Sequence, residues 1–319
     1  MAPCPLPSPG WLRRPRKETL MFFDDYSRFL KTSTVWSERD RLNLRYEAIF
    51  AANEDVFDGA RVLDLASHDG RWSFAALHTG AAHVTGIESR QEAVDNATAN
   101  LSHYGVESEK YRFVHGDVFD ALRSEEFDVD VVLCLGFMYH TYRHTELLHR
   151  IRQIDPKYLL VDSTVVPDET QPFVKLYEDR PQKPGEATLD VFAHGTSTLV
   201  GRPTVPALRM MLRAYDFDVE HTYDWGALID EHPGASRIGD YADGKRVTMR
   251  CRTGVPDSTK HDDVVADALP SSHATTTVNG SDQEVAQEVA QETTSKQWRD
   301  LINRGLARTT GYELRRSPR

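Results

Sequence analysis

Acidic residues stand at or near the ends of three apolar runs, where they could bind polar groups of a ligand. Asp64 lies in the run RVLDL, Glu88 follows HVTGI, and Asp117 closes YRFVHGD, while Gly70 ends the loop after the first run. A carboxylate such as that of Glu88 can accept both hydroxyls of a ribose, and that of Asp117 can accept an adenine amino group. A glycine lets the backbone turn sharply and approach a ligand. These residues predict a site for an adenosine-containing ligand.

The loop after the first run distinguishes two kinds of adenosine ligand. A dinucleotide loop needs three glycines around a pyrophosphate, whereas DLASHDG has Ala66 and His68 at two of those positions. Asp64 and Asp69 would repel a pyrophosphate and suit a ligand with an amino group and a sulfonium. We therefore predict S-adenosylmethionine as the cofactor. The residues predicted to bind it are Asp64, Ser67, Gly70, Glu88, Asp117 and Gly136.

Apolar runs alternate with segments of helical spacing through the middle of the chain, which is the pattern of a parallel sheet with helices on both faces. The predicted strands are 61–65, 83–87, 111–117, 129–136 and 157–163. The predicted helices between them are 71–80, 90–105 and 144–154, and residues 203–225 and 245–252 add a helix and two strands. The sequence predicts an α/β fold with a Rossmann-like seven-stranded sheet, whose ligand site lies at the carboxyl ends of the strands.

Composition divides the chain into five segments. We predict disorder over 1–18, a helical cap over 19–60, the α/β domain over 61–253, a disordered acidic and polar linker over 254–295, and a basic amphipathic tail over 296–319. The cap is predicted to form helices with one apolar face each, made by Phe22, Tyr26, Phe29 and Leu30 and by Leu42, Leu44, Tyr46 and Ile49. The tail has seven Lys or Arg and two acidic residues, so it is predicted to contact a membrane surface or a protein, or to fold back on its own domain.

Composition, net charge and cysteine count limit the class of protein. No apolar run approaches the roughly 18 residues that span a bilayer, and no secretory signal is evident, so we predict a cytoplasmic protein. The formal charge of -11 argues against a broad nucleic-acid footprint. Three widely spaced cysteines indicate neither a disulfide framework nor a zinc site.

The residues after the fourth predicted strand are candidates for catalysis. Tyr139 and His140 follow Gly136 where the methyl group of the cofactor is expected, and His140 suits a general base because its ordinary pKa is about 6.5. Both residues could instead only line the pocket. His140 and His144 have metal-ligand spacing without a third ligand, and Asp162 ends the fifth strand without an acidic partner, so we predict no metal. An Asn or Asp followed by two prolines and an aromatic is absent after the strand, which favours oxygen as the acceptor atom.

The chain resembles the class I S-adenosylmethionine-dependent methyltransferases. VLDLASHDG stands in the place of the family's V-L-D-x-G-x-G-x-G, and Asp64, Gly70, Glu88 and Asp117 match the family residue for residue. LCLGFMYHTYRHTELLHRI and GRPTVPALRMMLRAYDFDVE resemble the tRNA wobble-uridine carboxymethyltransferase group and its uncharacterised relatives, with Thr204 in place of a serine. The resemblance implies a Rossmann-like methyltransferase fold that uses S-adenosyl-L-methionine.

Three functions stay open from the sequence. The first is O-methylation of a small molecule or glycan. The second is modification of the tRNA wobble uridine, which is less favoured and could use carboxy-S-adenosylmethionine; its extra carboxylate needs a cation, and the sequence does not assign Arg71 or Arg246 to that role. The third is a non-catalytic sensor or scaffold that binds an adenosine ligand. Tyr139 and His140 favour an enzyme over the sensor.

Overall fold

The computed structural model describes residues 21–35, 38–167, 170–183 and 185–254. The chain divides into two units, Met1–Pro256 and Asp257–Arg319, and the second lies wholly outside the described residues. The predictions for 1–18, for 296–319 and for 254–295 apart from Gly254 also concern residues outside the described part. Among the described helices, none has the length and apolar character that crossing a membrane requires.

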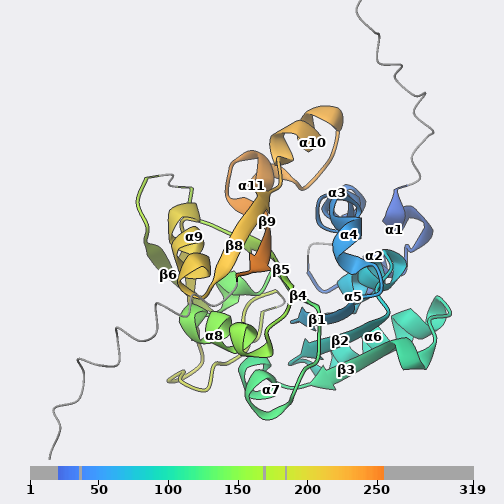
Figure 1. Cartoon of the computed structure of the whole chain (residues 1–319), viewed down its shortest axis with the longest axis horizontal. Helices are drawn as coiled ribbons and strands as arrows, with labels where there is room; N and C mark the ends of the chain where they lie inside the picture. Colours follow the sequence, from blue (N-terminus) through green and yellow to red (C-terminus); the bar gives the residue numbers. More distant parts are fainter. Residues whose placement is uncertain (1–20, 36–37, 168–169, 184, 255–319) are drawn as a thin grey trace, which may run out of the picture. The chain divides into compact units, whose positions relative to one another are not determined.

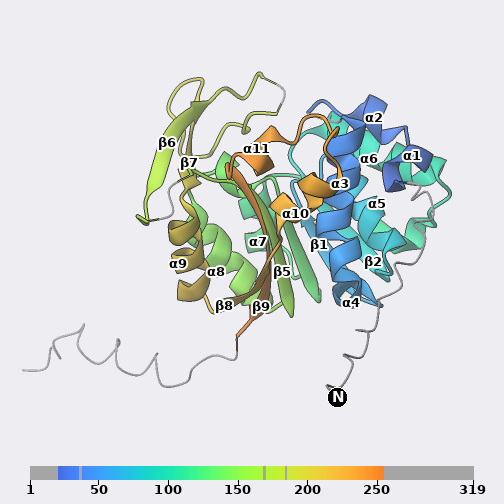
Figure 2. The ribbon, with the colours of Figure 1, turned by 90° about the horizontal axis from the view of Figure 1, so that it is seen from above.

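A seven-stranded sheet forms the centre of the described unit (Figures 1 and 2). Its strands are β1 Arg61–Leu65, β2 His83–Glu88, β3 Tyr111–His115, β4 Val131–Leu135, β5 Tyr158–Thr164, β8 Phe217–Thr222 and β9 Arg246–Thr253. They lie in the order β3-β2-β1-β4-β5-β9-β8, with β1 to β5 parallel and β9 antiparallel to both of its neighbours. The predicted Rossmann-like α/β sheet is confirmed, and its switch point lies between β1 and β4.

Helices cover both faces of this sheet, as Figure 2 shows. One face carries α3 Arg39–Ile49, α5 Arg71–His78 and α6 Gln91–His103, and the other carries α7 Val118–Ser124, α8 His144–Ile154 and α9 Val205–Ala214. Side chains alternate along each strand, so Leu63 and Leu65 pack with α7, α8 and α9, while Val62 and Val84 pack with α3, α5 and α6. The near-continuous apolar strands follow from burial on both sides.

The N-terminal cap is helical, but α3 differs from its prediction. The cap contains α1 Phe22–Asp25, α2 Phe29–Thr32, α3 and α4 Glu54–Phe57. Leu42 and Ile49 of α3 pack toward the sheet, whereas Leu44 packs against the cluster around Trp225 of α10 Trp225–Glu231. Arg41 is buried as well. The prediction of a single apolar face is wrong because α3 lies between two packed layers and has no solvated side wide enough to show a helical period.

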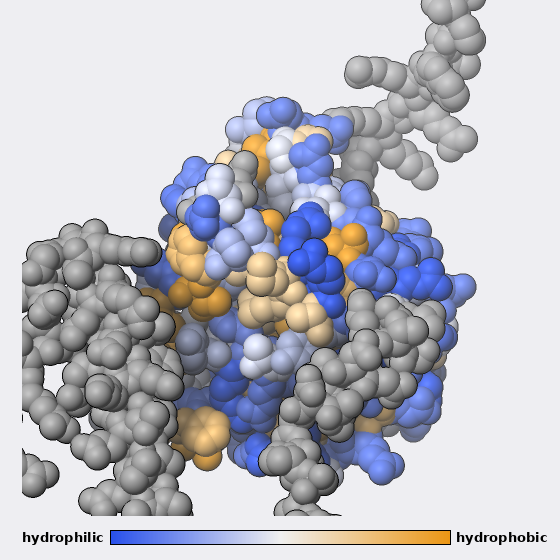
Figure 3. Space-filling view, turned by 60° about the vertical axis from the view of Figure 1, so that its left-hand side comes forward, coloured by the Kyte–Doolittle hydropathy of each residue, from blue (hydrophilic) through white to orange (hydrophobic). Residues whose placement is uncertain are grey.

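An antiparallel hairpin between β5 and α9 was not predicted. It consists of β6 Val174–Asp179 and β7 Thr198–Pro203. Most of β6 is exposed or half-buried, so its residues lack the apolar signature of the central strands. Figure 3, which brings this side forward, shows hydrophobic residues at the surface. The exposed apolar side chains of the hairpin and its connection are Phe173, Leu176, Leu189, Val191, Phe192 and Leu199.

Hydrogen bonds join the hairpin to the segment that follows β4. The amide of Gly201 on β7 donates to the carbonyl oxygen of Thr141 over 3.1 Å, and His144 Nε2 lies 3.1 Å from the carbonyl oxygen of Gly201. Both partners follow the short helix η3 Met138–His140 after β4. The hairpin therefore covers the region where the sequence predicts catalytic residues.

Candidate active site

A pocket of about 630 Å³ opens at the carboxyl ends of the central strands. Its wall is formed by the loops after β1, β2 and β4, the start of α3, the hairpin and β9. Of the predicted site residues, the structure brings Glu88, Gly136, Tyr139 and His140 into this wall. The volume is in the range of pockets that bury a small ligand.

The loop after β1 has a glycine-like backbone at two positions that are not glycine. Ala66 and His68 have φ angles of 55° and 52°, and Gly70, the N-cap of α5, has a φ of 77°. Every second residue of the loop is thus left-handed, a conformation that costs a residue with a Cβ about 1–2 kcal/mol. The positions where the sequence departs from the glycine pattern therefore keep its backbone conformation.

Gly70 is needed for packing. A Cβ at this position would lie 3.0 Å from Ala97 Cβ and from Phe113 Cζ and 3.1 Å from Leu101 Cδ1. These atoms belong to α6 and β3. The prediction that Gly70 lacks a side chain to admit a ligand therefore needs correction, because helix and strand atoms occupy that space.

Glu88 is held rigidly at the end of β2. Its Oε2 accepts the amide N–H of His68 over 3.0 Å, and its Oε1 accepts the amide N–H of Arg90 over 2.9 Å. The residue is 3% exposed and lies in the pocket wall. A carboxylate fixed by two backbone donors can accept further hydrogen bonds from ligand hydroxyls without reorganising.

Asp64, Ser67 and Asp117 lie behind the pocket wall. Asp64 is buried and accepts the hydroxyl of Ser73 over 2.7 Å, and burial raises the pKa of this carboxyl to about 7. The hydroxyl of Ser67 is buried beside Gly86 and has no hydrogen-bond partner among the described residues. Asp117 is the N-cap of α7 and accepts two amides, so it follows β3 instead of closing it. None of the three is in the pocket wall.

Asp69 is buried and neutralised by the protein itself. Its Oδ1 accepts Arg71 Nε over 2.8 Å, and its Oδ2 accepts the hydroxyl of Thr32 over 2.9 Å. Burial alone would raise the pKa of Asp69, but Arg71, His68 and Thr32 together outweigh it and lower the pKa to about 2. The charge of Asp69 thus fixes Arg71 and the loop, whereas the sequence interpretation gave it to the ligand.

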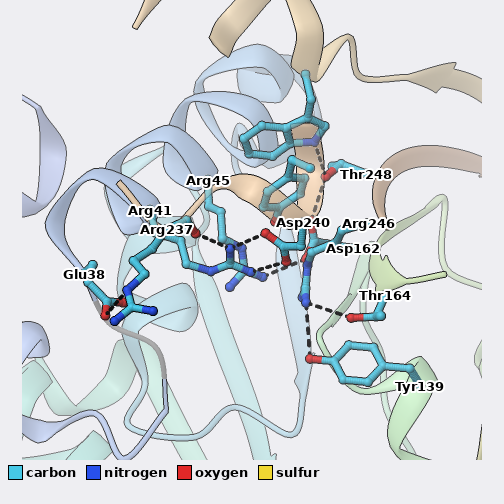
Figure 4. A network of polar contacts seen from close by, with 12 residues as sticks. Glu38, Arg41, Arg45, Tyr139, Asp162, Thr164, Arg237, Asp240, Arg246 and Thr248 are labelled. Carbon is cyan, nitrogen blue, oxygen red and sulfur yellow. Dashed lines mark hydrogen bonds and ion pairs between the residues drawn. The ribbon is translucent and has the colours of Figure 1, made fainter. Parts of the chain in front are cut away.

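Asp162 on β5 is the centre of a buried polar network (Figure 4). Its Oδ1 accepts Arg45 Nη2 over 2.9 Å and two nitrogens of Arg246 over 2.7 and 2.6 Å. Its Oδ2 accepts the hydroxyls of Tyr241 and Thr248 over 2.8 and 2.7 Å. These five donors, drawn from α3, α11 Gly239–Ala242 and β9, use both oxygens of one carboxylate.

The contacts of this network fix the protonation states of its groups. Burial alone would raise the pKa of Asp162, but Arg246 and Arg45 hold it well below its ordinary value, while burial raises the pKa of Tyr241 well above its ordinary value. Asp162 is therefore ionised and Tyr241 neutral at physiological pH. Arg41 adds a bidentate pair with Asp240 over 2.6 and 2.8 Å. Arg41, Arg45 and Arg246 all reach the pocket wall.

Tyr139 and His140 lie on η3 at the edge of the pocket. Arg246 Nη1 donates to the hydroxyl of Tyr139 over 3.3 Å, and His140 Nδ1 lies 2.8 Å from Oδ2 of Asp179 at the end of β6. Gly136, with a φ of 102°, leaves room for Arg246, whose Nη2 would be 3.4 Å from a Cβ there. The end of β4 thus presents a phenol and an imidazole, each held by a charged partner.

His144 does not share a site with His140. It is 3% exposed, and its ring pairs with the backbone of the hairpin. Among the described residues, no group of three or more His, Cys, Asp or Glu side chains is arranged to hold a metal ion. Asp162 likewise directs both oxygens to arginine and hydroxyl donors.

Sequence reasoning missed Asp179, Arg41 and Arg45. Asp179 lies on an unpredicted strand, and the two arginines lie on a helix interpreted as a cap. A signal was present in α3, where Arg41 and Arg45 are one helical turn apart and share a face. Their spacing indicates a common target without indicating which one.

Comparison with known proteins supports the assignment of the domain. Residues 62–154 match a family described as "Methyltransferase domain". The ribosomal RNA large subunit methyltransferase I of Pseudoalteromonas translucida is 37% identical over 78 residues, which are 24% of this chain and 20% of that protein. The chain thus spans about a fifth of the length of such curated relatives.

Solved structures that match part of this chain include methyltransferases. The N-terminal domain of EvdMO1 with SAH bound is 18% identical, with a TM-score of 0.45, and the match covers 67% of this chain and 80% of that chain. The 1,6-didemethyltoxoflavin-N1-methyltransferase of Burkholderia thailandensis is 19% identical, with a TM-score of 0.48, over 73% of this chain and 86% of that chain. From the family match and the strand order, the chain contains a class I S-adenosylmethionine-dependent methyltransferase domain.

Proposed function

We propose that the protein transfers a methyl group from S-adenosylmethionine to an oxygen atom of a small-molecule or glycan acceptor in the cytoplasm. One observation carries the proposal: a single pocket has Glu88 in one part of its wall and Tyr139 and His140 in another. The proposal keeps the domain limits 61–253 and a membrane or protein contact for the tail as predicted from the sequence.

The residues of the pocket fit the cofactor. Glu88 would accept the ribose hydroxyls, because its carboxylate is already fixed by the amides of His68 and Arg90 and lies in the wall. Ala66 and His68 of the left-handed loop lie in the pocket wall, next to the end of β1. When bound, the cofactor supplies an electrophilic methyl group on a cationic sulfur.

The protein contributes positioning and a proton acceptor. The residues at the end of β4 would hold the acceptor oxygen in line with the methyl group that the cofactor would supply. His140 takes the hydroxyl proton, and Tyr139 orients the acceptor beside Arg246. The hairpin covers this end of the pocket and limits access of water.

The test measures methyl transfer with His140 removed. Radiolabelled S-adenosylmethionine is incubated with small-molecule, glycan and tRNA fractions, and the acceptor that takes the label is purified. His140→Ala should then lower turnover by roughly 10²- to 10⁴-fold with nearly intact cofactor affinity. His149→Ala, an exposed histidine of α8 outside the pocket wall, is the control. Equal turnover in wild type and His140→Ala would reject His140 as the base.

A second candidate is carboxymethyl transfer to tRNA, and Arg246 is the observation that favours it. Arg246 Nη1 faces Tyr139 and Thr164, both at 3.3 Å, in the pocket wall. It would pair with the extra carboxylate of carboxy-S-adenosylmethionine. Calorimetry with both cofactors decides between the candidates: tighter binding of the carboxylated form, together with label transfer to tRNA, would favour this one.

A further inference from the structure

We propose that Asp179 is a positioning residue for His140, which it holds in the tautomer whose Nε2 can accept a proton in the pocket. The inference rests on the proposed function for the catalytic use of His140. The pairing itself rests on the contacts of the β6–β7 hairpin.

The carboxylate of Asp179 is fixed before it meets His140. Asp179 is 6% exposed, and its Oδ2 accepts the amide of Ala187 over 3.0 Å as well as facing His140 Nδ1 at 2.8 Å. Its backbone is paired with Thr198 of β7. The position of the carboxylate is therefore set by the hairpin and by the segment between its strands.

An ionised carboxylate can only accept hydrogen bonds, so the proton of a neutral His140 must lie on Nδ1. The lone pair then lies on Nε2, which no described residue of the chain contacts by a hydrogen bond. Burial raises the pKa of Asp179, but the bonds from His140 and Ala187 outweigh it and lower that pKa. Asp179 thus stays ionised and stabilises the imidazolium that forms when Nε2 takes a proton.

Two cations share the pocket wall with this pair. They are Arg202 of β7 and Arg246 of β9, and Arg202 also favours the ionised form of Asp179. The remaining titratable groups of the wall near this pair are Tyr139, whose ring centroid is 4.3 Å from that of His140, and Glu186.

The experiment needs no acceptor. Nuclear magnetic resonance of isotope-labelled histidine in the full chain reports the tautomer of His140, first in the wild type and then in Asp179→Asn. We expect an Nδ1–H tautomer in the wild type, and in the variant a mixture of both tautomers, because an amide can donate as well as accept. Glu186→Gln removes a nearby wall carboxylate that does not touch His140, and it should leave the tautomer as in the wild type.

An Nε2–H tautomer in the wild type, or an unchanged Nδ1–H tautomer in Asp179→Asn, would overturn the inference. The wild-type tautomer decides even if the variant does not fold. With an acceptor in hand, Asp179→Asn should lower kcat at least tenfold with little change in KM, and Asp179→Glu should recover part of it. The proposed function fails separately, through full turnover in His140→Ala, so the two failures are distinguishable.

Discussion

The two sides of the pocket are built from contacts of different range. On the Glu88 side, the carboxylate binds amides 20 and 2 positions away, within one β-α-β unit. On the opposite side, Asp162 joins Arg45 across 117 positions and Arg246 across 84, and His140 joins Asp179 across 39. The local side carries a motif that sequence reasoning can find, and the distant side carries charges that only assembly brings together.

This difference has an energetic consequence. The Glu88 side uses backbone donors, which are present wherever the strand and loop form. The Asp162 side places full charges in the interior, where each depends on its partner, and removing one partner leaves the other unpaired. The acceptor side of the pocket is therefore more sensitive to single substitutions than the side expected to hold the cofactor.

The largest effect is expected for Asp162→Asn, which leaves Arg45 and Arg246 buried without their shared carboxylate. The free energy of unfolding should fall by about 3–5 kcal/mol, as for other broken buried pairs. Guanidinium denaturation measures it. The control is Asp128→Asn, whose partner Arg61 lies at the surface, and which should change stability little. Equal losses in the two variants would contradict the comparison.

Next is the pH dependence caused by Asp64. Burial raises its pKa to about 7 from an ordinary 3.8. Between these values the folded state holds a proton that the unfolded state has released, so stability falls as pH rises through this window, by up to about 4 kcal/mol in all. Asp64→Asn should remove this slope. Denaturation midpoints at several pH values between about 4 and 7 measure it, and parallel curves for the two proteins would refute the assignment.

The Glu88 side is tested by cofactor affinity. Glu88→Ala should weaken S-adenosylmethionine binding by about 1.5–3 kcal/mol, the range for lost charge-assisted hydrogen bonds. Isothermal titration calorimetry measures it. Glu92→Ala, an exposed carboxylate on α6, is the control. Unchanged affinity in a folded Glu88→Ala protein would remove Glu88 from the site.

The smallest effects are expected in the left-handed loop, where two opposite substitutions should change the free energy of unfolding in opposite directions. Gly70→Ala should destabilise the protein by about 1–2 kcal/mol, because φ is 77° and a Cβ would crowd α6 and β3. Ala66→Gly should stabilise it by about 0.5–1 kcal/mol, since it relieves a φ of 55°. Thermal denaturation measures both, and a destabilising Ala66→Gly would mean that the loop is not strained there.

Strands β1 to β5 and helices α5, α6 and α8 followed from local pattern, whereas α7 was not predicted. β1 was predicted with its observed bounds, and the other central strands differ by a few residues at their ends. Apolar strands buried on both faces leave a signal that needs no knowledge of the partner. The hairpin strand β6 leaves none, because most of its residues are exposed, and so Asp179 could not be assigned to the site from sequence.

The amino-acid sequence alone determined the α/β sheet and the strand ends at which Glu88, Gly136, Tyr139 and His140 stand, because these depend on periodicity and on parallel topology. Only the tertiary structure decided the partners of these residues: Asp179 for His140, Arg246 for Tyr139, and packing for Gly70. The physical reason is the sequence separation between the interacting residues. The conformation of a strand or a loop depends mainly on residues that are near in sequence. The partner of a buried charge depends on which opposite charge the fold places beside it.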